Sequence, residues 1–573
     1  MKMGILFATF LLFLVGFVAF GAQPISPPSP AQWDVFAKQF IESYLKLHPD
    51  LAVSLGRHEF DGMLPDWSPE GLKTQISWLH QQRDSITAFE SKGLDTLRHL
   101  EQEILLTEVN GDLFWLEEVK EQERNPTFYS LDPSVYIIRA YAPLETRMAA
   151  YTRFANAVPA AVEQIKQNLR PPLARPFIDI GETVFGGFAL YFQNDVPAAF
   201  SDVSDSVLQE KFLTANVRAI RGMNDLIAWL DRQKSTATDS FALGPKLFSE
   251  MLRVSEHVDI PLTELERIGR QDLERNLAAL REACARYAPG KSVQDCIERE
   301  QADKPAGNLL VAAQKQLAEL KKFVASQKLA SIPGTEDVIV KESPPYMRWN
   351  SASISIPGPF EKGLPSRYYI TLPDPSWSHK ARLDYVPGKA TLLFTSVHEV
   401  WPGHFLQFLH ARQCPFTSGK IFGSYAFSEG WAHYAEEMMW DAGLHKEEPE
   451  AHIGQLKEAL LRNVRYLSAL GLHTGGMTVQ QSEQMFREKA FQDSANAHQQ
   501  ALRGTFDPGY LNYTIGKLMI RQLRDDWCAT RGGRKAWGPF HDAFLSYGAP
   551  PIPLVRAIML GPNSGPALKP LSQ

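Results

Sequence analysis

Residues 392–412 read LLFTSVHEVWPGHFLQFLHAR, which combines apolar helical spacing with histidines, a glutamate and a Pro-Gly pair. Apolar residues recur three or four positions apart up to position 397, which predicts a helix with one buried face. His398 and Glu399 therefore lie side by side well inside that helix. Burying such side chains is costly unless they find partners, so the pair marks a candidate functional site.

The spacing of two histidines decides whether they can share a metal ion. In the HExxH pattern the histidines are four positions apart on one helix face, with the glutamate beside them. Here position 402 is proline, and His404 is the next histidine after His398. On a straight helix His404 would lie ~120° around the axis and ~9 Å along it. Two zinc–nitrogen bonds of ~2 Å do not span that separation.

Pro402 and Gly403 predict that the helix is not straight. Proline has no amide hydrogen for the carbonyl of His398 and its ring collides there, while glycine tolerates unusual backbone angles. A break or bulge at these residues would bring His404 back toward His398. The alternative is a pair of structural histidines flanking a proline kink, and the spacing alone leaves both interpretations open.

A third candidate ligand follows in FSEGWAHYAE, residues 427–436. Ser428 is predicted to start a helix, which would place Glu429 in its first turn. Two neutral histidines and one carboxylate leave the fourth position of zinc open, which is the pattern of catalytic sites. The alternative is that Glu429 interacts only with the dipole of its own helix.

Other side chains of this helix receive different expectations. His433 lies one turn after Glu429 on the same face and is the rival ligand. We assign it a supporting position, in which it orients Glu429 or contacts a substrate. Glu436 and Glu437 are expected to be solvated surface charges.

Composition and charge are those of an ordinary globular protein. Of the 573 residues, 44% are hydrophobic and 22% are charged, which is enough apolar sequence for a large core. The 59 basic and 65 acidic residues give a formal net charge of -6. Because no broad cationic surface is expected, nucleic acid is excluded as an expected partner.

The chain begins like an exported protein. Residues 1–21 have the basic start, apolar core and small-residue exit of a signal peptide, and residues 22–30 form a Pro- and Ser-rich tether. We expect a periplasmic or secreted protein without stable membrane association, the alternative being an uncleaved anchor. Cys284 and Cys296 are the expected disulfide pair, although all four cysteines could equally be buried free thiols.

The fold is predicted to be mainly α. Residues 31–335 form an N-terminal helical region, and residues 336–565 form a region with a small β-sheet followed by helices, in one continuous unit. The strands are expected within residues 338–340, 351–356 and 368–371. A small sheet beside the site helix is typical of the catalytic half of a zinc peptidase, where an edge strand lies along the substrate.

Two motifs resemble a known family, the bacterial proteins of domain of unknown function 885. HEVWPGH at 398–404 is similar to that family's HExxPGH, and EGWAHY at 429–434 is similar to its EGWAxY. Tyr369 lies in a segment similar to the family's strand and turn, and Arg503 and Tyr513 resemble its later R and YxxG positions. The sequence departs from the family at Tyr510, where glutamine is usual, and we expect this residue near the cleft.

The resemblance implies a zinc metallopeptidase, and enclosure of the site by helices suggests, by analogy, that its substrates are short peptides. Zn would be held by His398, His404 and Glu429, and Glu399 would be the general base. Tyr513 or Arg503 would stabilise the developing oxyanion, and substrate contacts are expected from Arg503, Tyr369 and His433. Two other functions stay open at this point: an exported peptide-binding protein without catalysis, and a hydrolase of a non-peptide amide.

Overall fold

The computed structural model describes residues 29–344, 347–348 and 351–569. The predicted signal peptide, residues 1–21, and the tether as far as residue 28 lie outside the described residues. The first helix, α1, spans Pro30–Leu47 and is capped by Ser29, whose hydroxyl accepts from the amide of Gln32. No helix in the described ranges has both the length and the apolar character that crossing a membrane requires.

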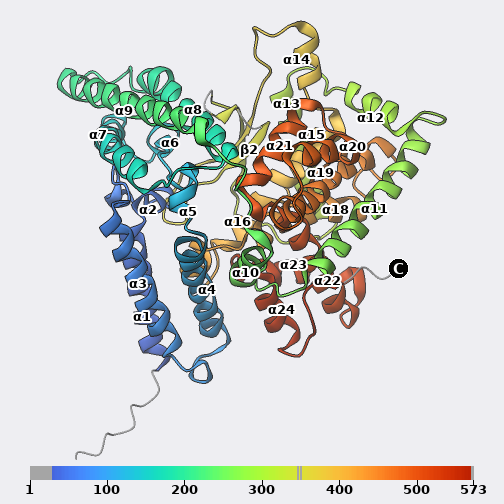
Figure 1. The fold of residues 1–573 in the computed structure, drawn as a ribbon. Helices are drawn as coiled ribbons and strands as arrows, with labels where there is room; N and C mark the ends of the chain where they lie inside the picture. Colours follow the sequence, from blue (N-terminus) through green and yellow to red (C-terminus); the bar gives the residue numbers. More distant parts are fainter. Residues whose placement is uncertain (1–28, 345–346, 349–350, 570–573) are drawn as a thin grey trace, which may run out of the picture.

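The fold is mainly helical, as predicted, and its helices form two lobes (Figure 1). We define the N-terminal lobe as α1 to α9, coloured blue to green. Its helices are α1, α2 (Pro49–Ser54), α3 (Pro69–Thr87), α4 (Thr96–Leu113), α5 (Glu121–Arg124), α6 (Ser134–Ile138), α7 (Leu144–Asn168), α8 (Arg175–Ala199) and α9 (Ser206–Gln233).

The C-terminal lobe contains the remaining helices and the sheet. Four helices precede the sheet: α10 (Gly244–Glu256), α11 (Leu262–Tyr287), α12 (Val293–Ala302) and α13 (Leu309–Ser326). The others follow it: α14 (His379–Tyr385), α15 (Lys389–Glu399), α16 (His404–Ala411), α17 (Ser418–Ile421), α18 (Tyr425–Asp441), α19 (Pro449–Thr474), α20 (Val479–Lys489), α21 (Ser494–Phe506), α22 (Asn512–Ala529), α23 (Trp537–Leu545) and α24 (Ile552–Leu560).

The boundary between the two apolar clusters does not coincide with the domain boundary predicted at residue 335. One apolar cluster lies in the N-terminal lobe and ends along the chain at Leu230, apart from Phe422. The larger cluster takes up the chain from Leu243 onward, apart from Phe114 and Val119. Helices α10 to α13 therefore share the core of the C-terminal lobe. The predicted division at residue 335 follows the change from helix to strand, which does not report which helices pack together. Between the lobes, Ser418 donates a hydrogen bond to Glu101 at 2.8 Å.

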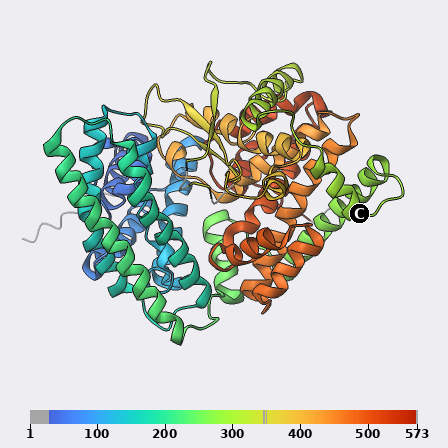
Figure 2. The ribbon, with the colours of Figure 1, turned by 90° about the horizontal axis from the view of Figure 1, so that it is seen from above.

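The small sheet has three strands in the order β1-β3-β2, and all three lie where they were predicted. β1 (Val338–Glu342) pairs parallel with β3 (Ser366–Ile370), and β2 (Ala352–Ser355) pairs antiparallel with β3. The sheet, in yellow, lies near the junction of the two lobes (Figure 2). β2 is an edge strand of the sheet, and its residues line the large cleft described below. The edge strand, rather than the central one, is available to an extended ligand.

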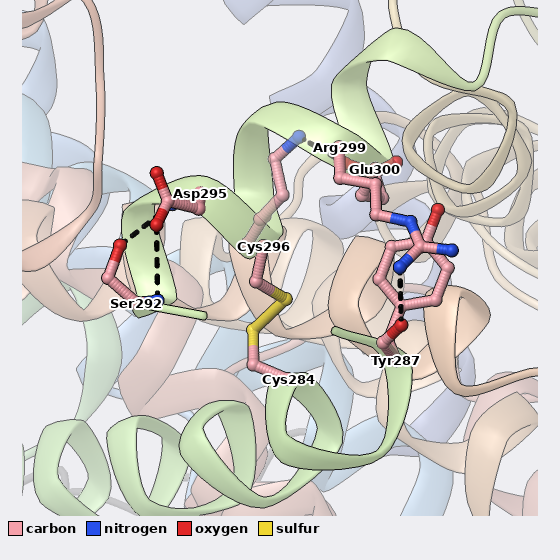
Figure 3. The surroundings of a disulfide bond; sticks show 8 residues. Cys284, Tyr287, Ser292, Asp295, Cys296, Arg299 and Glu300 are labelled. Atoms are coloured by element: carbon pink, nitrogen blue, oxygen red, sulfur yellow. Dashed lines mark hydrogen bonds and ion pairs between the residues drawn. A yellow bond between two sulfur atoms is a disulfide. The ribbon is translucent and has the colours of Figure 1, made fainter. Parts of the chain in front are cut away.

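The predicted disulfide between Cys284 and Cys296 is present and joins the end of α11 to α12 (Figure 3). Ser292 caps α12 in a reciprocal pair with Asp295, and Arg299 lies 4.6 Å from the centre of the Tyr287 ring. These contacts fix the turn between the two helices on the outside of the C-terminal lobe. Cys414 and Cys528 are buried free thiols.

We expect His541 on α23 to make the stability of the C-terminal lobe dependent on pH. Its Nδ1 donates to the carbonyl of Leu329 at 2.6 Å, its Nε2 accepts from the hydroxyl of Tyr434 at 2.8 Å, and its ring packs on Trp431. Burial lowers the pKa of His541 to about 3, so the folded protein keeps it neutral while the unfolded chain binds a proton below a pKa of ~6.5.

Because the folded pKa lies below the unfolded one, His541 lowers the free energy of unfolding as pH falls from ~6.5 toward ~3, by up to about 1.4 kcal/mol per pH unit. His541→Asn keeps a donor and an acceptor but does not titrate, so its urea unfolding curves should depend less on pH in this range. The exposed His498→Asn serves as control. Equal pH dependence in wild type and His541→Asn would contradict this assignment.

Candidate metal centre

The site helix breaks at the predicted residues. α15 ends at Glu399 and α16 begins at His404, and the four residues between them form a tight turn that contains a cis peptide bond before Pro402. The amide of Gly403 donates to the carbonyl of Val397 at 2.9 Å, and Nε1 of Trp431 donates to the carbonyl of Pro402 at 2.9 Å. The turn is therefore fixed both from within and by α18.

Glycine is required at position 403 because the turn leaves no room for a side chain there. A Cβ atom at this position would lie 1.7 Å from the carbonyl oxygen of His398 and 2.5 Å from that of Val397. These neighbours are backbone atoms of the turn itself, so they cannot move aside without moving His398 or His404. A side chain of any size at position 403 is incompatible with this turn.

We expect Gly403→Ala to displace one of the two histidines and to lower metal content and activity at least about tenfold, because a ligand misplaced by ~1 Å loses much of its contribution. Metal analysis and thermal unfolding of purified protein measure the effect. Gly186→Ala is the matched control, since a Cβ there meets nothing within 4 Å. A Gly403→Ala protein with wild-type metal content and activity would show that the turn is not needed.

Three side chains converge at the end of α15. Oε2 of Glu429 lies 3.3 Å from Nε2 of His398 and 3.3 Å from Nε2 of His404, and the three atoms all lie within 4.8 Å of one another. Ligands of a tetrahedral zinc ion at ~2.0–2.1 Å are roughly 3.3 Å apart. Oε2 of Glu429 is buried and has no hydrogen-bond partner among the described residues. A buried carboxylate oxygen that lies 3.3 Å from each of two imidazole nitrogens fits a divalent cation held by all three.

Glu429 reaches this position from the second turn of α18. The predicted start at Ser428 is wrong, because Ser424 caps the helix by accepting from the amide of Phe427. Both serines are good caps, and local sequence does not choose between them. α18 is held against α22 by a glycine contact: a Cβ at Gly516 would lie 1.9 Å from the carbonyl oxygen of Ala426.

Glu436 supports the first histidine. Its carboxylate lies 2.7 Å from Nδ1 of His398 and 3.1 Å from Nδ1 of His433, and it is fully buried. Burial opposes ionisation, but Arg462 and His433 hold the pKa of Glu436 well below its usual range. The ionised carboxylate can accept the proton of Nδ1, which leaves Nε2 of His398 directed toward Glu429. Carboxylate–histidine pairs of this kind orient metal ligands in proteins.

The expectation that Glu436 and Glu437 are solvated is wrong. Glu437 is also buried and pairs with Arg275 at 2.8 Å and with Lys517 at 3.5 Å. The partners come from α11 and α22, far away in sequence. From the sequence alone, two adjacent glutamates in a helix look like surface residues, because distant partners such as Arg275 and Lys517 cannot be recognised.

We expect Glu436→Gln to weaken metal binding about 10–100-fold, because an amide holds the imidazole less firmly than a carboxylate does. Competition with a chelator of known affinity measures this change. Glu483→Gln on α20, which changes a half-buried carboxylate that pairs with His498, should bind metal as wild type does. Unchanged affinity in Glu436→Gln would mean that Glu436 serves packing alone.

The site opens into a cleft of about 3850 Å³ between the lobes, lined by α8, β2, α15, α19 and α21. Glu399 lines this cleft beside His398, and its carboxylate makes no hydrogen bond or ion pair with another described residue. Tyr513 and Arg503 also line it. The Tyr513 ring stacks on that of His398 with centroids 6.3 Å apart, and Arg503 lies 5.9 Å from the centre of the Tyr513 ring.

Two of the expected substrate contacts lie away from the cleft. Tyr369 is on the central strand β3 and is 5% exposed, while the edge strand β2 lines the cleft instead. His433 is 0% exposed and contacts Glu436, so it supports the site from behind and does not orient Glu429. Tyr510 was expected near the cleft, but it is fully buried and donates to Ser468 at 2.8 Å.

Comparison with known proteins supports the family resemblance. Residues 49–559 match the family described as "Bacterial protein of unknown function (DUF885)". A structure described as that of "a putative lipoprotein of unknown function" from Shewanella oneidensis is 23% identical with a TM-score of 0.77, over 93% of this chain and 100% of that one. A structure of "the putative lipoprotein" from Colwellia psychrerythraea is 18% identical with a TM-score of 0.76, over 92% of this chain and 98% of that one. At these identities the structures show a shared fold alone. No curated protein matches the chain.

Proposed function

The chain belongs to the DUF885 family of bacterial proteins, and we propose that it is a zinc-dependent peptidase that acts on short peptides outside the cytoplasm. The observation that carries the proposal is the convergence of Nε2 of His398, Nε2 of His404 and Oε2 of Glu429 at the wall of the cleft. Two imidazoles and one carboxylate form a ligand set of catalytic zinc sites, in which a further position stays open.

Glu399 is the proposed general base. A zinc ion held by the three ligands supplies Lewis acidity toward a carbonyl oxygen and a water molecule. Glu399 is adjacent to His398 and lines the same cleft without a competing partner among the described residues. In the proposed reaction its carboxylate takes a proton from the attacking water and returns it to the leaving amine nitrogen.

Tyr513 is the proposed oxyanion donor. Its ring stacks on His398 at the metal centre, and its hydroxyl can donate a hydrogen bond to the oxygen on which negative charge develops. Burial raises the pKa of Tyr513 above its ordinary value, and the charge of Glu429 acts in the same direction. The phenol therefore stays protonated and able to donate at neutral pH.

The cleft suits an extended peptide rather than a small metabolite. Its volume of about 3850 Å³ exceeds the ~300–1,000 Å³ of usual small-molecule sites. The edge strand β2 lies along it and can pair with an extended backbone. Action outside the cytoplasm is supported by the signal-like residues 1–21, by a disulfide, and by relatives described as lipoproteins.

Hydrolysis of a defined peptide mixture tests the proposal. The protein lacking residues 1–21 is treated with chelator, reloaded with zinc and incubated with randomised N-acetylated pentapeptides, and products are identified by mass spectrometry. We expect cleavage that chelator abolishes and zinc restores. A protein that binds no zinc and cleaves nothing, yet retains peptides, would instead be a peptide-capturing protein.

A further inference from the structure

Three arginines surround Tyr513 beside the metal centre. The guanidinium carbons of Arg462, Arg465 and Arg503 lie 5.8 Å, 5.0 Å and 5.9 Å from the centre of the Tyr513 ring. All three arginines line the cleft. Such a concentration of positive charge, mostly buried, requires compensating negative charge.

Two of these arginines are compensated within the protein. Arg462 pairs with Glu458, and its Nη2 lies 3.5 Å from Glu436. Arg503 pairs with Asp507 at 2.9 Å and donates to the hydroxyl of Tyr425 at 3.0 Å. The charges of Arg462 and Arg503 are therefore neutralised by carboxylates of the protein itself.

Arg465 differs from the other two. It is only 7% exposed, and its Nε donates to the neutral amide oxygen of Gln500 at 2.8 Å. In the described part of the chain it has no carboxylate partner, and Nη1 and Nη2 donate to nothing there. The charges that act on it most strongly include those of Arg503 and Arg462. Nη1 and Nη2 of Arg465 are therefore available to donate to a ligand in the cleft. The positive charge of this guanidinium is not neutralised by a carboxylate of the described residues.

We propose that Arg465 is a specificity-determining residue that binds a carboxylate of the substrate, and that this carboxylate is the C-terminal one. The planar guanidinium offers two parallel donors that match a carboxylate, which is the strongest neutralising group a peptide can supply. The inference rests on the proposed peptidase function and assigns it a substrate class, namely peptides with a free carboxyl end close to the cleaved bond.

The arrangement places that end near the metal centre. The Tyr513 ring contacts both Arg465, at 5.0 Å, and the His398 ring, at 6.3 Å. Taken one after the other, these distances correspond to about three residues of extended chain or fewer, at roughly 3.3–3.6 Å each. A peptide whose carboxylate is bound by Arg465 would present one of its last peptide bonds to Glu399, so the C-terminal products would be single residues or very short peptides.

Matched peptides test the inference. Three randomised N-acetylated pentapeptide mixtures are compared: one with free carboxyl ends, one with amidated ends, and one amidated with glutamate as the last residue. Zinc-loaded wild type should hydrolyse the free acids with a kcat/KM about 100-fold above that for the amides, the factor expected for a charged hydrogen-bonded pair.

The variants assign the effect to Arg465. Arg465→Gln should remove the preference mainly by raising KM for the acids, because the carboxylate is bound equally in the ground and transition states. Arg465→Lys should retain part of it. Arg487→Gln removes an exposed arginine that also lines the cleft, and should leave the acid-to-amide ratio unchanged.

A binding measurement separates this inference from the proposed function. Zinc-loaded Glu399→Gln should bind the acids more tightly than the amides, and the additional Arg465→Gln change should abolish the difference while zinc content and melting temperature stay the same. Binding of amidated glutamate peptides that depends on Arg465 would assign the carboxylate to a side chain. Equal binding of acids and amides would overturn the inference even in an active peptidase.

Discussion

Glu399→Gln should keep zinc bound and lose turnover. Glu399 is not one of the three converging side chains, but it lines the cleft next to His398. Glutamine has nearly the same shape and cannot accept a proton from water, so kcat should fall about 10²–10⁴-fold. Zinc content by metal analysis and kcat on the peptide mixture are measured on the same preparation.

The control for this variant is Glu483→Gln, which removes another carboxylate that lines the cleft. It should retain both zinc and turnover. If Glu399→Gln hydrolysed peptides at the wild-type rate, the general base would be another group. If it lost zinc, Glu399 would be part of the ligand set.

His404→Ala should lose both zinc and activity. Removal of one of the three proposed ligands would leave only Glu429 and His398 to hold the ion. Glu429 would also lose the imidazole that lies 3.3 Å from its Oε2. We expect zinc affinity to fall by a factor on the order of 10³ or more, since each ligand of such a site contributes several kcal/mol. Dialysed protein should then contain well under one zinc ion per chain.

The exposed His498→Ala is the control for His404→Ala and should keep its zinc. His433→Gln distinguishes the rival ligand, because His433 faces Glu436 and not the three converging atoms. A His404→Ala protein with wild-type zinc affinity, or a His433→Gln protein without zinc, would require a different ligand set.

The break in the site helix could be predicted because its causes are local. Pro402 and Gly403 act on the backbone immediately before them, and the resulting turn brings two histidines together that a straight helix would separate. The three strands were also predicted, since alternating residues between Pro and Gly report strand structure without reference to distant parts of the chain.

The features that sequence did not reveal depend on distant partners. Glu436 and Glu437 are buried because α11, α19 and α22 supply cations to them. Arg465 is unusual because no carboxylate among the described residues pairs with it. The absence of a partner leaves no pattern in the sequence. The division of the core near residue 240 likewise depends on which helices pack together, which helical periodicity does not specify.

The central claim is that His398, His404 and Glu429 bind one zinc ion. A crystal structure of zinc-loaded protein, with anomalous difference maps on both sides of the zinc absorption edge, tests it most directly. We predict one zinc peak ~2.0–2.2 Å from Nε2 of both histidines and from an oxygen of Glu429. A map without zinc between these three side chains, or with zinc bound only elsewhere, would contradict it.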